Sequence, residues 1–210
     1  NDSKFAEQWP HTNTQARLGW DIERGSSSVI IAVIDTGIYS LHEDLSSKIW
    51  VNAGEIADNG LDDEGNGFID VSKGYDFVNL EAFNMQSYCN ASEDCITEDN
   101  NPSDFQGHGT HVSGIAAGKT NNAKGIAGVC WNCTIMPLRA GWADVGGNGA
   151  LLNEDIAQAL YYASNNGAKI ISMSFGGSES QLVKDAVDYA YSRNIVLIAA
   201  AGNNYGNVKN

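Results

Sequence analysis

Three polar side chains in this chain are of the types that acyl-transfer chemistry requires. Asp35 stands in Val33-Ile-Asp-Thr-Gly37, His108 stands in Gly107-His-Gly-Thr-His-Val112, and Asn203 ends the run Ala-Ala-Ala-Gly-Asn. A carboxylate can orient an imidazole, an imidazole can act as a general base, and an amide can donate to an oxyanion. Together they predict acyl transfer, with Asp35 as orienter, His108 as base and Asn203 as oxyanion donor.

Each of these residues also has an ordinary explanation. Asp-Thr-Gly is a common turn, and an asparagine after glycine is a frequent turn former. His108 and His111 are three positions apart and could be packed helix residues or a metal pair. A zinc hydrolase of the His-Glu-x-x-His type lacks its glutamate here. The occurrence of all three side chains at the ends of successive predicted elements favours a catalytic function.

The elements that must position these side chains alternate between strand and helix. Apolar β-branched runs predict strands buried on both faces at 29–34, 134–138, 169–174 and 195–200. One helix is predicted from an Asn153 cap to Gly167, and a second over 180–192. The apolar stripes of these helices are Ile156, Ala159, Leu160 and Ala163, and then Leu182, Val183, Ala186, Val187 and Ala190. The pattern predicts a three-layer α/β fold with a mostly parallel sheet, which places function at the carboxyl ends of the strands.

Composition limits the classes of partner. The 210 residues suit a single domain (1–210), and 51–106 reads as loops inserted between core elements. The net charge of −14, from 26 acidic and 12 basic residues, argues against nucleic acid. No apolar run approaches the roughly 18 residues of a membrane span. We expect a monomer whose signal peptide, if it had one, has been removed.

Four cysteines form the local pairs Cys89/Cys95 and Cys130/Cys133. Short spacings and an even number favour two local disulfides in an oxidising, exported compartment, and therefore secretion. Free thiols, a four-thiolate zinc site and a Cys-x-x-Cys redox pair are the alternatives. The redox pair requires a helix after the motif, whereas a strand is predicted after Cys133.

The acidic run 62–70 resembles the first nine positions of an EF-hand loop. Its candidate calcium ligands are the side chains of Asp62, Glu64, Asn66 and Asp70 and the carbonyl of Phe68. Position twelve is Lys73, so a true EF-hand is excluded and another segment must complete the site. The alternative is a solvated acidic turn.

The motifs around Asp35 and His108 resemble those of the subtilisin-like serine proteases (subtilases), in particular the thermitase-like branch. The resemblance extends through 170–177 and 199–203, and it leaves out insertions at 51–70, a calcium loop, and at 80–103, a cysteine-containing loop. It implies the subtilisin-like fold and hydrolysis of peptide bonds in peptide or protein substrates. It also implies a propeptide.

The resemblance implies further site residues. An extended substrate is expected to pair with two edge segments, and Ala200–Gly202 is expected to form a small apolar wall for a bulky uncharged side chain. The implied substrate-binding residues are Gly147, Asn148, Gly149, Ser174, Phe175, Gly176, Ala200, Ala201 and Gly202. A second calcium site is implied at the amino-terminal arm, with ligands from Asp2, Asp44, Lys119, Asn122, Lys124 and Ile126, which makes about two sites in all.

One family feature is missing from these residues. The serine of the family lies in Gly-Thr-Ser, whereas the only Gly-Thr here is Gly109-Thr110, which precedes His111. We therefore expect a domain that is incomplete at its carboxyl end and inactive alone, its serine lying in a missing segment. One alternative is a calcium-binding pseudoprotease that binds peptides without cleaving them. A sedolisin-type acid peptidase is disfavoured, because that class has glutamate in place of His108.

Overall fold

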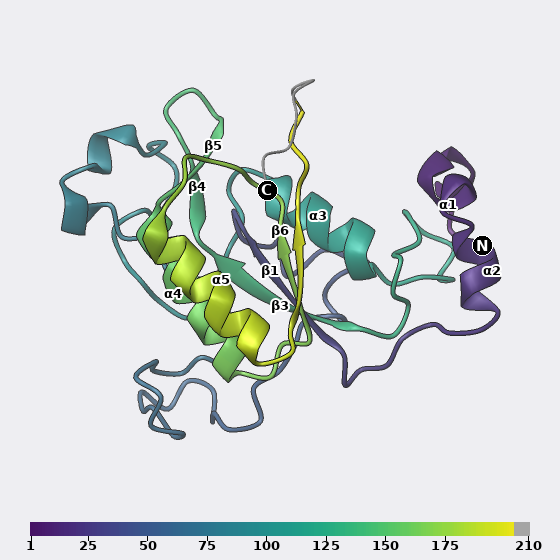
Figure 1. Cartoon of the computed structure of the whole chain (residues 1–210), viewed down its shortest axis with the longest axis horizontal. Helices are drawn as coiled ribbons and strands as arrows, with labels where there is room; N and C mark the ends of the chain where they lie inside the picture. Colours follow the sequence, from purple (N-terminus) through teal and green to yellow (C-terminus); the bar gives the residue numbers. More distant parts are fainter. Residues whose placement is uncertain (204–210) are drawn as a thin grey trace.

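A five-stranded parallel sheet forms the centre of the computed structural model, which describes residues 1–203 (Figure 1). Its strands lie in the order β2-β3-β1-β6-β7, so β1 has one neighbour on each side. Their bounds are β1 Ile30–Asp35, β2 Tyr75–Asp76, β3 Thr134–Arg139, β6 Ile170–Met173 and β7 Val196–Ala199. The predicted strands agree with these to within one or two residues, and the α/β prediction is confirmed.

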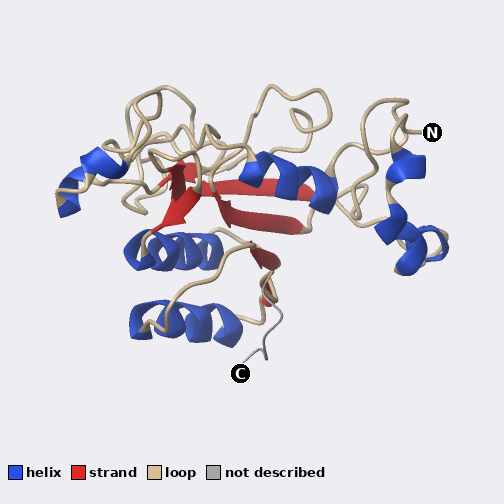
Figure 2. Ribbon diagram, turned by 90° about the horizontal axis from the view of Figure 1, so that it is seen from above, coloured by secondary structure: helices blue, strands red, loops and turns tan. Residues whose placement is uncertain are grey.

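Helices cover both faces of this sheet (Figure 2). α3 (His108–Ala117) lies on one face, and α4 (Asn153–Asn165) and α5 (Gln181–Ser192) lie on the other. β4 (Gly141–Ala143) and β5 (Gly149–Leu151) form a separate antiparallel hairpin. The short elements are α1 (Trp9–Asn13), α2 (Ala16–Trp20) and the 3-10 helices η1 (Phe5–Glu7), η2 (Glu81–Phe83) and η3 (Gln86–Tyr88).

Alternation along β1 explains why its apolar run is uninterrupted. Successive strand side chains point to opposite faces. Ile31 and Val33 pack with Ala117 of α3, whereas Ala32 and Ile34 join the cluster built from α4 and α5. All four side chains are buried, so a polar residue at any of these positions would lie in one of the two cores. The strand can be polar only where it ends, at Asp35.

The ends of the two covering helices differ in their capping. Ser180 caps α5 by accepting a hydrogen bond from the amide of Val183. In α4, however, Asn153 is the first helical residue, and Leu152 occupies the cap position without a side-chain bond. β5 ends at Leu151 and residue 152 is still extended, so the helix begins directly after it, one position earlier than predicted. The exposed Glu154 places negative charge in the first turn instead.

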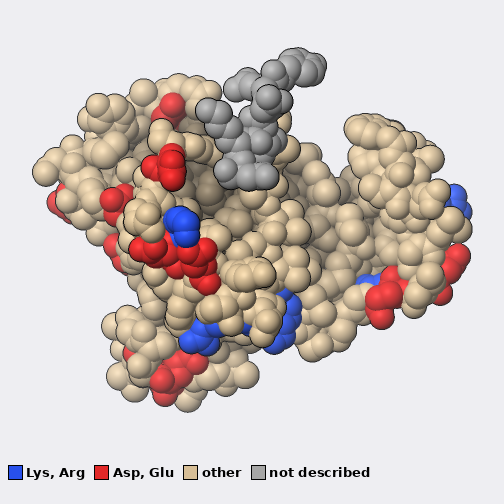
Figure 3. All heavy atoms as spheres, in the orientation of Figure 1, with Lys and Arg blue, Asp and Glu red and all other residues tan. Residues whose placement is uncertain are grey.

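The two long loops contain little regular structure, and both are anchored to the core. Phe68 holds the loop 51–70 through edge-to-face contacts with Tyr75, Phe77 and Tyr162. The loop 80–103 packs on the hairpin, at the left of Figure 1. On the face shown in Figure 3, acidic side chains gather over α5 and in the loop below it. No helix within residues 1–203 is long and apolar enough to cross a membrane.

Candidate active site

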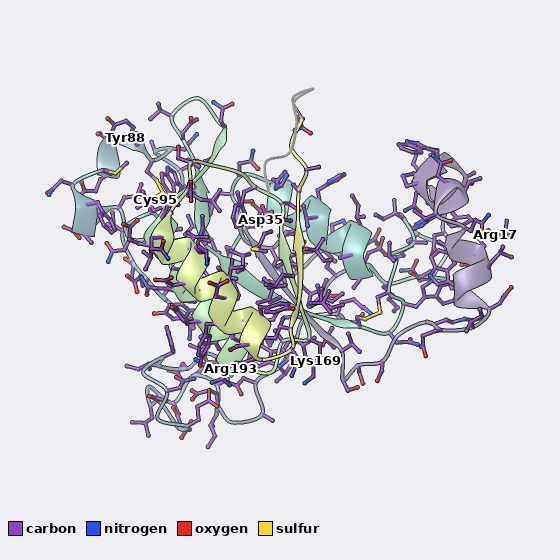
Figure 4. The ribbon with its side chains drawn as sticks, viewed as in Figure 1. Arg17, Asp35, Tyr88, Cys95, Lys169 and Arg193 are labelled. Carbon is purple, nitrogen blue, oxygen red and sulfur yellow. A yellow bond between two sulfur atoms is a disulfide. The ribbon has the colours of Figure 1, made fainter. Side chains whose placement is uncertain are left out.

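Asp35 and His108 form a hydrogen-bonded pair at the centre of the sheet edge. Asp35 is the last residue of β1, and His108 is the first residue of α3. Nδ1 of His108 lies 2.7 Å from Oδ1 of Asp35. Figure 4 shows Asp35 near the start of α3. β2 and β3 lie on one side of β1, and β6 and β7 lie on the other side, so the strand order reverses at β1. In open α/β sheets, the functional site usually lies at the carboxyl ends of the strands at such a reversal.

The two members of the pair differ in exposure. The Asp35 side chain is 4% exposed and the His108 side chain is 48% exposed. The amide of Thr36 also donates to Oδ1 of Asp35, at 2.8 Å, while Oδ2 has no hydrogen-bond partner among the described residues. A buried carboxylate that holds Nδ1 leaves Nε2 as the basic nitrogen of the ring. The pair can therefore act as a general base toward the solvent side.

Asp104 fixes the start of α3 against the end of β1. Its Oδ1 accepts from the amides of Gln106 and Gly107 and from the Thr36 hydroxyl. Its Oδ2 accepts from the amide and the hydroxyl of Thr110. This carboxylate thus satisfies amides around the first turn of the helix and places His108 next to β1. Sequence reasoning missed Asp104, because it stands outside the cap position of α3 and its bond to the Thr36 hydroxyl joins segments that are 68 positions apart.

Gly109 allows the helix and the strand to approach closely. A Cβ atom at this position would lie 2.2 Å from the carbonyl oxygen of Gly37 and 3.1 Å from Cβ of Asp35. Any side chain would therefore push α3 away from the β1 end and lengthen the Asp35–His108 hydrogen bond. Gly109, which follows His108 in the motif, therefore has a steric function in this site.

A cleft of about 260 Å³ opens beside His108. Two segments form its walls: Gly149 and Leu151 of β5, and residues 174–176 that follow β6. Gly147 and Asn148, which the sequence placed in the binding edge, belong instead to the hairpin turn. The amide and the carbonyl of Asn148 are both bonded to Asp144, so they are not available to a peptide. The extended strand β5 begins at Gly149.

The third predicted catalytic residue, Asn203, lies beyond the end of β7. It is exposed, as are Ala200, Ala201 and Gly202 before it. The amide of Ala200 donates to the carbonyl of Met173, which keeps the chain beside β6 at this point. Asn203 is not among the residues that line the cleft at His108.

The amino-terminal arm provides the first candidate metal site. Asp2 and Asp44 are buried, at 6% and 3% exposure, against the loop 119–126. Asp2 accepts from the amides of Asn121 and Asn122, and Asp44 accepts from the Asn122 side chain at 2.7 Å. Lys124 Nζ pairs with the exposed Glu43, so its ammonium group points away from the loop. Hard oxygen donors in a tight loop suit calcium.

The loop 62–70 provides the second candidate. Its carboxylates cap loop amides: Asp62 accepts from the amides of Asn66 and Gly67, and Asp70 accepts from those of Asn59 and Gly60. Glu64 accepts from the side chain of Asn66. In the described part of the chain, the only three carboxylate, histidine or cysteine groups with ligand atoms within 4.8 Å of one another are Cys89, Glu93 and Cys95. The carboxylates of this loop therefore form no such group of three.

Glu55 is a candidate ligand that the sequence did not reveal. It is 8% exposed, and its Oε1 accepts from the amides of Asp63 and Glu64. Its Oε2 is buried without a hydrogen-bond partner in the described structure. A buried anionic oxygen that faces an acidic loop needs a cation or a proton. Glu55 therefore belongs to the segment that could complete the site, which the sequence required but could not locate.

The cysteines are bonded within their local pairs, Cys89 to Cys95 and Cys130 to Cys133. No described cysteine is free. In the structure these sulfur atoms therefore form neither a four-thiolate zinc site nor a pair of free thiols. His111 is exposed on α3 and belongs to no cluster of metal-binding groups among residues 1–203.

Comparisons with known proteins agree with this geometry. The family model described as "Subtilase family" matches residues 26–210. The chain is 38% identical to the thermophilic serine proteinase of Bacillus sp. strain AK1 over 206 residues, which are 97% of this chain and 40% of that protein. It is 34% identical to thermitase of Thermoactinomyces vulgaris over 205 residues, which are 97% of this chain and 57% of thermitase. The chain thus spans about half the length of these relatives.

A solved structure is also similar in fold. The crystal structure of MycP1 with its N-terminal propeptide removed aligns with a TM-score of 0.58 at 20% identity, over 96% of this chain and 51% of that one. At this identity the likeness concerns the fold.

Proposed function

Because the chain belongs to the subtilase family, we propose that it supplies the aspartate, the histidine and the oxyanion amide of a serine endopeptidase. The observation that carries this proposal is the 2.7 Å contact between Asp35 and His108 at the carboxyl end of β1. A sedolisin-type mechanism is disfavoured by the same contact, because an imidazole and not a second carboxylate faces Asp35.

The proposed reaction follows from the chemistry of this pair. Nε2 of His108 removes the proton from a serine hydroxyl as that oxygen attacks the peptide carbonyl carbon, and the same nitrogen then gives the proton to the leaving amine. Asp35 holds the ring in the tautomer that carries its proton on Nδ1 and stabilises the imidazolium. Asn203 donates its side-chain N–H to the oxyanion of the tetrahedral intermediate.

The proposed substrate is an extended peptide that adds a strand between the two walls of the cleft. The open edge of β5 from Gly149 to Leu151 and the segment 174–176 offer backbone groups on either side of it. Residues 200–202 have no side chain larger than a methyl group. This wall suits a bulky uncharged side chain before the scissile bond.

We propose calcium at two places, where it would hold loops by its charge and take no part in the reaction. The first would be held by Asp2, Asp44 and Asn122 with carbonyls of Lys119, Lys124 and Ile126, and the buried carboxylates of Asp2 and Asp44 fit a cation there. The second would be held by the loop 62–70. The unpartnered Oε2 of Glu55 supports a cation at this second place.

Secretion is supported by relatives whose names state that they are extracellular, such as the extracellular protease of Xanthomonas campestris, 35% identical over 224 residues. The two disulfides also suit an exported protein. We further propose that the protein acts as a monomer and that a propeptide assists its folding, the latter by resemblance to the family.

In the proposed protease the nucleophile lies outside these residues, because no Gly-Thr-Ser occurs in them. We propose that a further segment of the same domain carries it. The exposed side chains of Val196 and Ile198 on β7, at 54% and 53% exposure, support a partner segment at this strand. A peptide-binding module without catalysis is the second candidate, and the missing motif is the observation that favours it.

A fluorophosphonate probe, which labels activated serines, separates the two candidates. We expect no labelling and no peptide hydrolysis by the 210-residue chain alone. The protein completed with a segment bearing Gly-Thr-Ser is expected to show both, and His108→Ala is expected to abolish them. Labelling of the 210-residue chain at a serine would refute the proposed division of the triad. A completed protein that binds peptides but cleaves none would favour the binding module.

A further inference from the structure

One carboxylate on the loop 80–103 joins the end of β3 to the first strand of the hairpin. Oε1 of Glu93 accepts from Nη2 of Arg139 at 2.6 Å, and Oε2 accepts from the amide of Ala143 at 2.7 Å. The side chains of Arg139 and Glu93 are both 0% exposed. Hydrogen bonds to an ionised group that is shielded from water are stronger than those between neutral groups.

Arg139 gives this carboxylate a fixed partner. Its guanidinium also pairs with the buried Asp76 of β2, and Nη2 donates to the carbonyl of Asp94 at 2.6 Å. β2 and the loop 80–103 are therefore both bonded to one arginine of β3. Glu93 is the member of this group that also contacts the hairpin, because it alone reaches the amide of β4.

The loop pairs with the outer edge of β4 much as an additional strand would. The amide of Asn90 donates to the carbonyl of Ala143 at 2.9 Å, and Cys89 forms an antiparallel bridge with Asp144. Both backbone groups of Ala143 are thus bonded to the loop. On its other side, Ala143 lies opposite Gly149 of β5.

The Cys89–Cys95 disulfide closes the loop around Glu93. Cys95 is buried with Val78, Leu80 and Trp142, and Trp142 is the central residue of β4. The amide of Leu80 also donates to the carbonyl of Cys95 at 2.7 Å. Figure 4 shows Cys95 on the hairpin side of the molecule, away from the amino-terminal helices. The disulfide and these contacts therefore hold the loop in the shape in which it contacts the hairpin.

The hairpin depends on such support. Its two strands have three residues each, and an isolated two-stranded hairpin is at best marginally stable in water. β4 is held by Glu93 on its outer side, and β5 lines the cleft at His108 on the other. A displacement of β4 would therefore move the edge at which we propose that substrate binds.

We propose that Glu93 is a positioning residue for peptide binding: by holding Arg139 and the Ala143 amide on one carboxylate, it fixes the β5 edge for extended substrates. This rests on the proposed protease function. Glu93 does not touch the substrate, so it acts only on ligands long enough to reach Gly149–Leu151. A substrate that occupies only the neighbourhood of His108 is insensitive to it.

The test is Glu93→Gln in the protease that contains this chain together with its serine. A glutamine has one acceptor oxygen and one amino group, so it can satisfy only one of the two donors and opposes the other with N–H. Glu81→Gln is the matched control, because it makes the same charge change at an exposed position of the same loop.

Two measurements follow. For a tetrapeptide anilide, KM is expected to rise about ten-fold in Glu93→Gln with kcat nearly unchanged, the pattern of lost uniform binding. For a single-residue ester, both constants are expected to change less than about two-fold. Hydrogen–deuterium exchange is expected to quicken at residues 141–151 and to stay unchanged in α3. Glu81→Gln is expected to behave like the unsubstituted protein in every measurement.

The possible outcomes separate a failure of this proposal from a failure of the proposed protease function. Equal effects on both substrates, or unchanged exchange at 141–151, would overturn the positioning function of Glu93. If the unsubstituted protein cleaves neither substrate, the protease function fails, and the exchange result then decides alone whether Glu93 holds the hairpin. Should Glu93→Gln not fold, Cys89→Ser with Cys95→Ser keeps Glu93 but opens its loop. That variant is also expected to raise KM for the tetrapeptide anilide and to change the constants for the ester little. An equal effect on both substrates would also overturn the proposal.

Discussion

Oδ1 of Asp35 and Nδ1 of His108 lie 2.7 Å apart although 73 positions separate the two residues in the sequence. Two packing conditions produce this contact. The apolar faces of β1 are both covered, so Asp35 is the first place where the strand can end in a charge. Gly109 then lets α3 approach until the first residue of the helix reaches that charge.

Asp35→Asn is expected to lower kcat of the complete protease by about 10⁴-fold, because an amide at this position favours the wrong imidazole tautomer. The rate of peptide anilide hydrolysis at saturating substrate measures kcat. Asp21→Asn, an exposed aspartate outside the site, is the control and is expected to retain full activity. A loss of less than ten-fold would contradict the orienting role of Asp35.

Asn203→Ala is expected to lower kcat about 10²–10³-fold, because one oxyanion donor is lost while substrate binding is kept. KM is therefore expected to change little. Asn165→Ala, which removes an exposed asparagine side chain at the end of α4, provides the comparison. If kcat were unaffected and only KM rose, Asn203 would belong to the substrate-binding wall and not to the oxyanion site.

The positions of the strands could be predicted because each is a short apolar run buried on both faces. Asp35 and His108 could be predicted for the same reason, since each follows directly from an element boundary: the end of β1 and the start of α3. Local sequence determines such boundaries to within a residue or two.

The buried charges could not be predicted. Arg139 pairs with Asp76 and Glu93, which lie 63 and 46 positions away, and nothing local distinguishes these acids from exposed ones. Glu55 is similar, since its burial depends on the path of the loop 51–70. The hairpin turn at 144–148 was also not predicted; there Asp144 accepts from both the amide and the side chain of Asn148.

Chelation with EDTA is expected to lower the unfolding temperature, because a ligand that binds only the native state stabilises it by about 2.7 kcal/mol per site at a concentration 100 times Kd. Differential scanning calorimetry with and without calcium measures this. In Asp44→Asn the chelator is expected to have a smaller effect. In Glu43→Gln, which changes the neighbouring exposed carboxylate, the effect is expected to stay the same. Identical melting curves with and without chelator, with no metal found by elemental analysis, would contradict both calcium sites.

Peptide mapping without reduction is expected to find two intrachain disulfides, Cys89–Cys95 and Cys130–Cys133. Both close short loops, so removing either one is expected to cost only about 2 kcal/mol of unfolding free energy. The Cys89–Cys95 pair is expected to matter more for exchange at the hairpin, because its loop carries Glu93. Cross-linked pairs between the two loops, or free thiols in protein purified without reductant, would contradict this pairing.

Asp155→Asn is expected to make the protein more stable at alkaline pH. Asp155 is 1% exposed in the first turn of α4, and burial raises its pKa from 3.8 to about 8, with the charges of Glu98 and Asp76 adding to this effect. Between these two values the folded state holds a proton that the unfolded state has released, so the free energy of unfolding falls as pH rises from about 4 to about 8.

Asparagine at position 155 has no proton to lose. At about pH 8.5 the variant is expected to gain roughly 1 kcal/mol, or about 2–4 °C, and the gain is expected to vanish near pH 5. Thermal unfolding followed by circular dichroism measures both points, with the exposed Glu154→Gln as control. A gain of the same size at both pH values would show that the effect is one of packing and not of the buried charge.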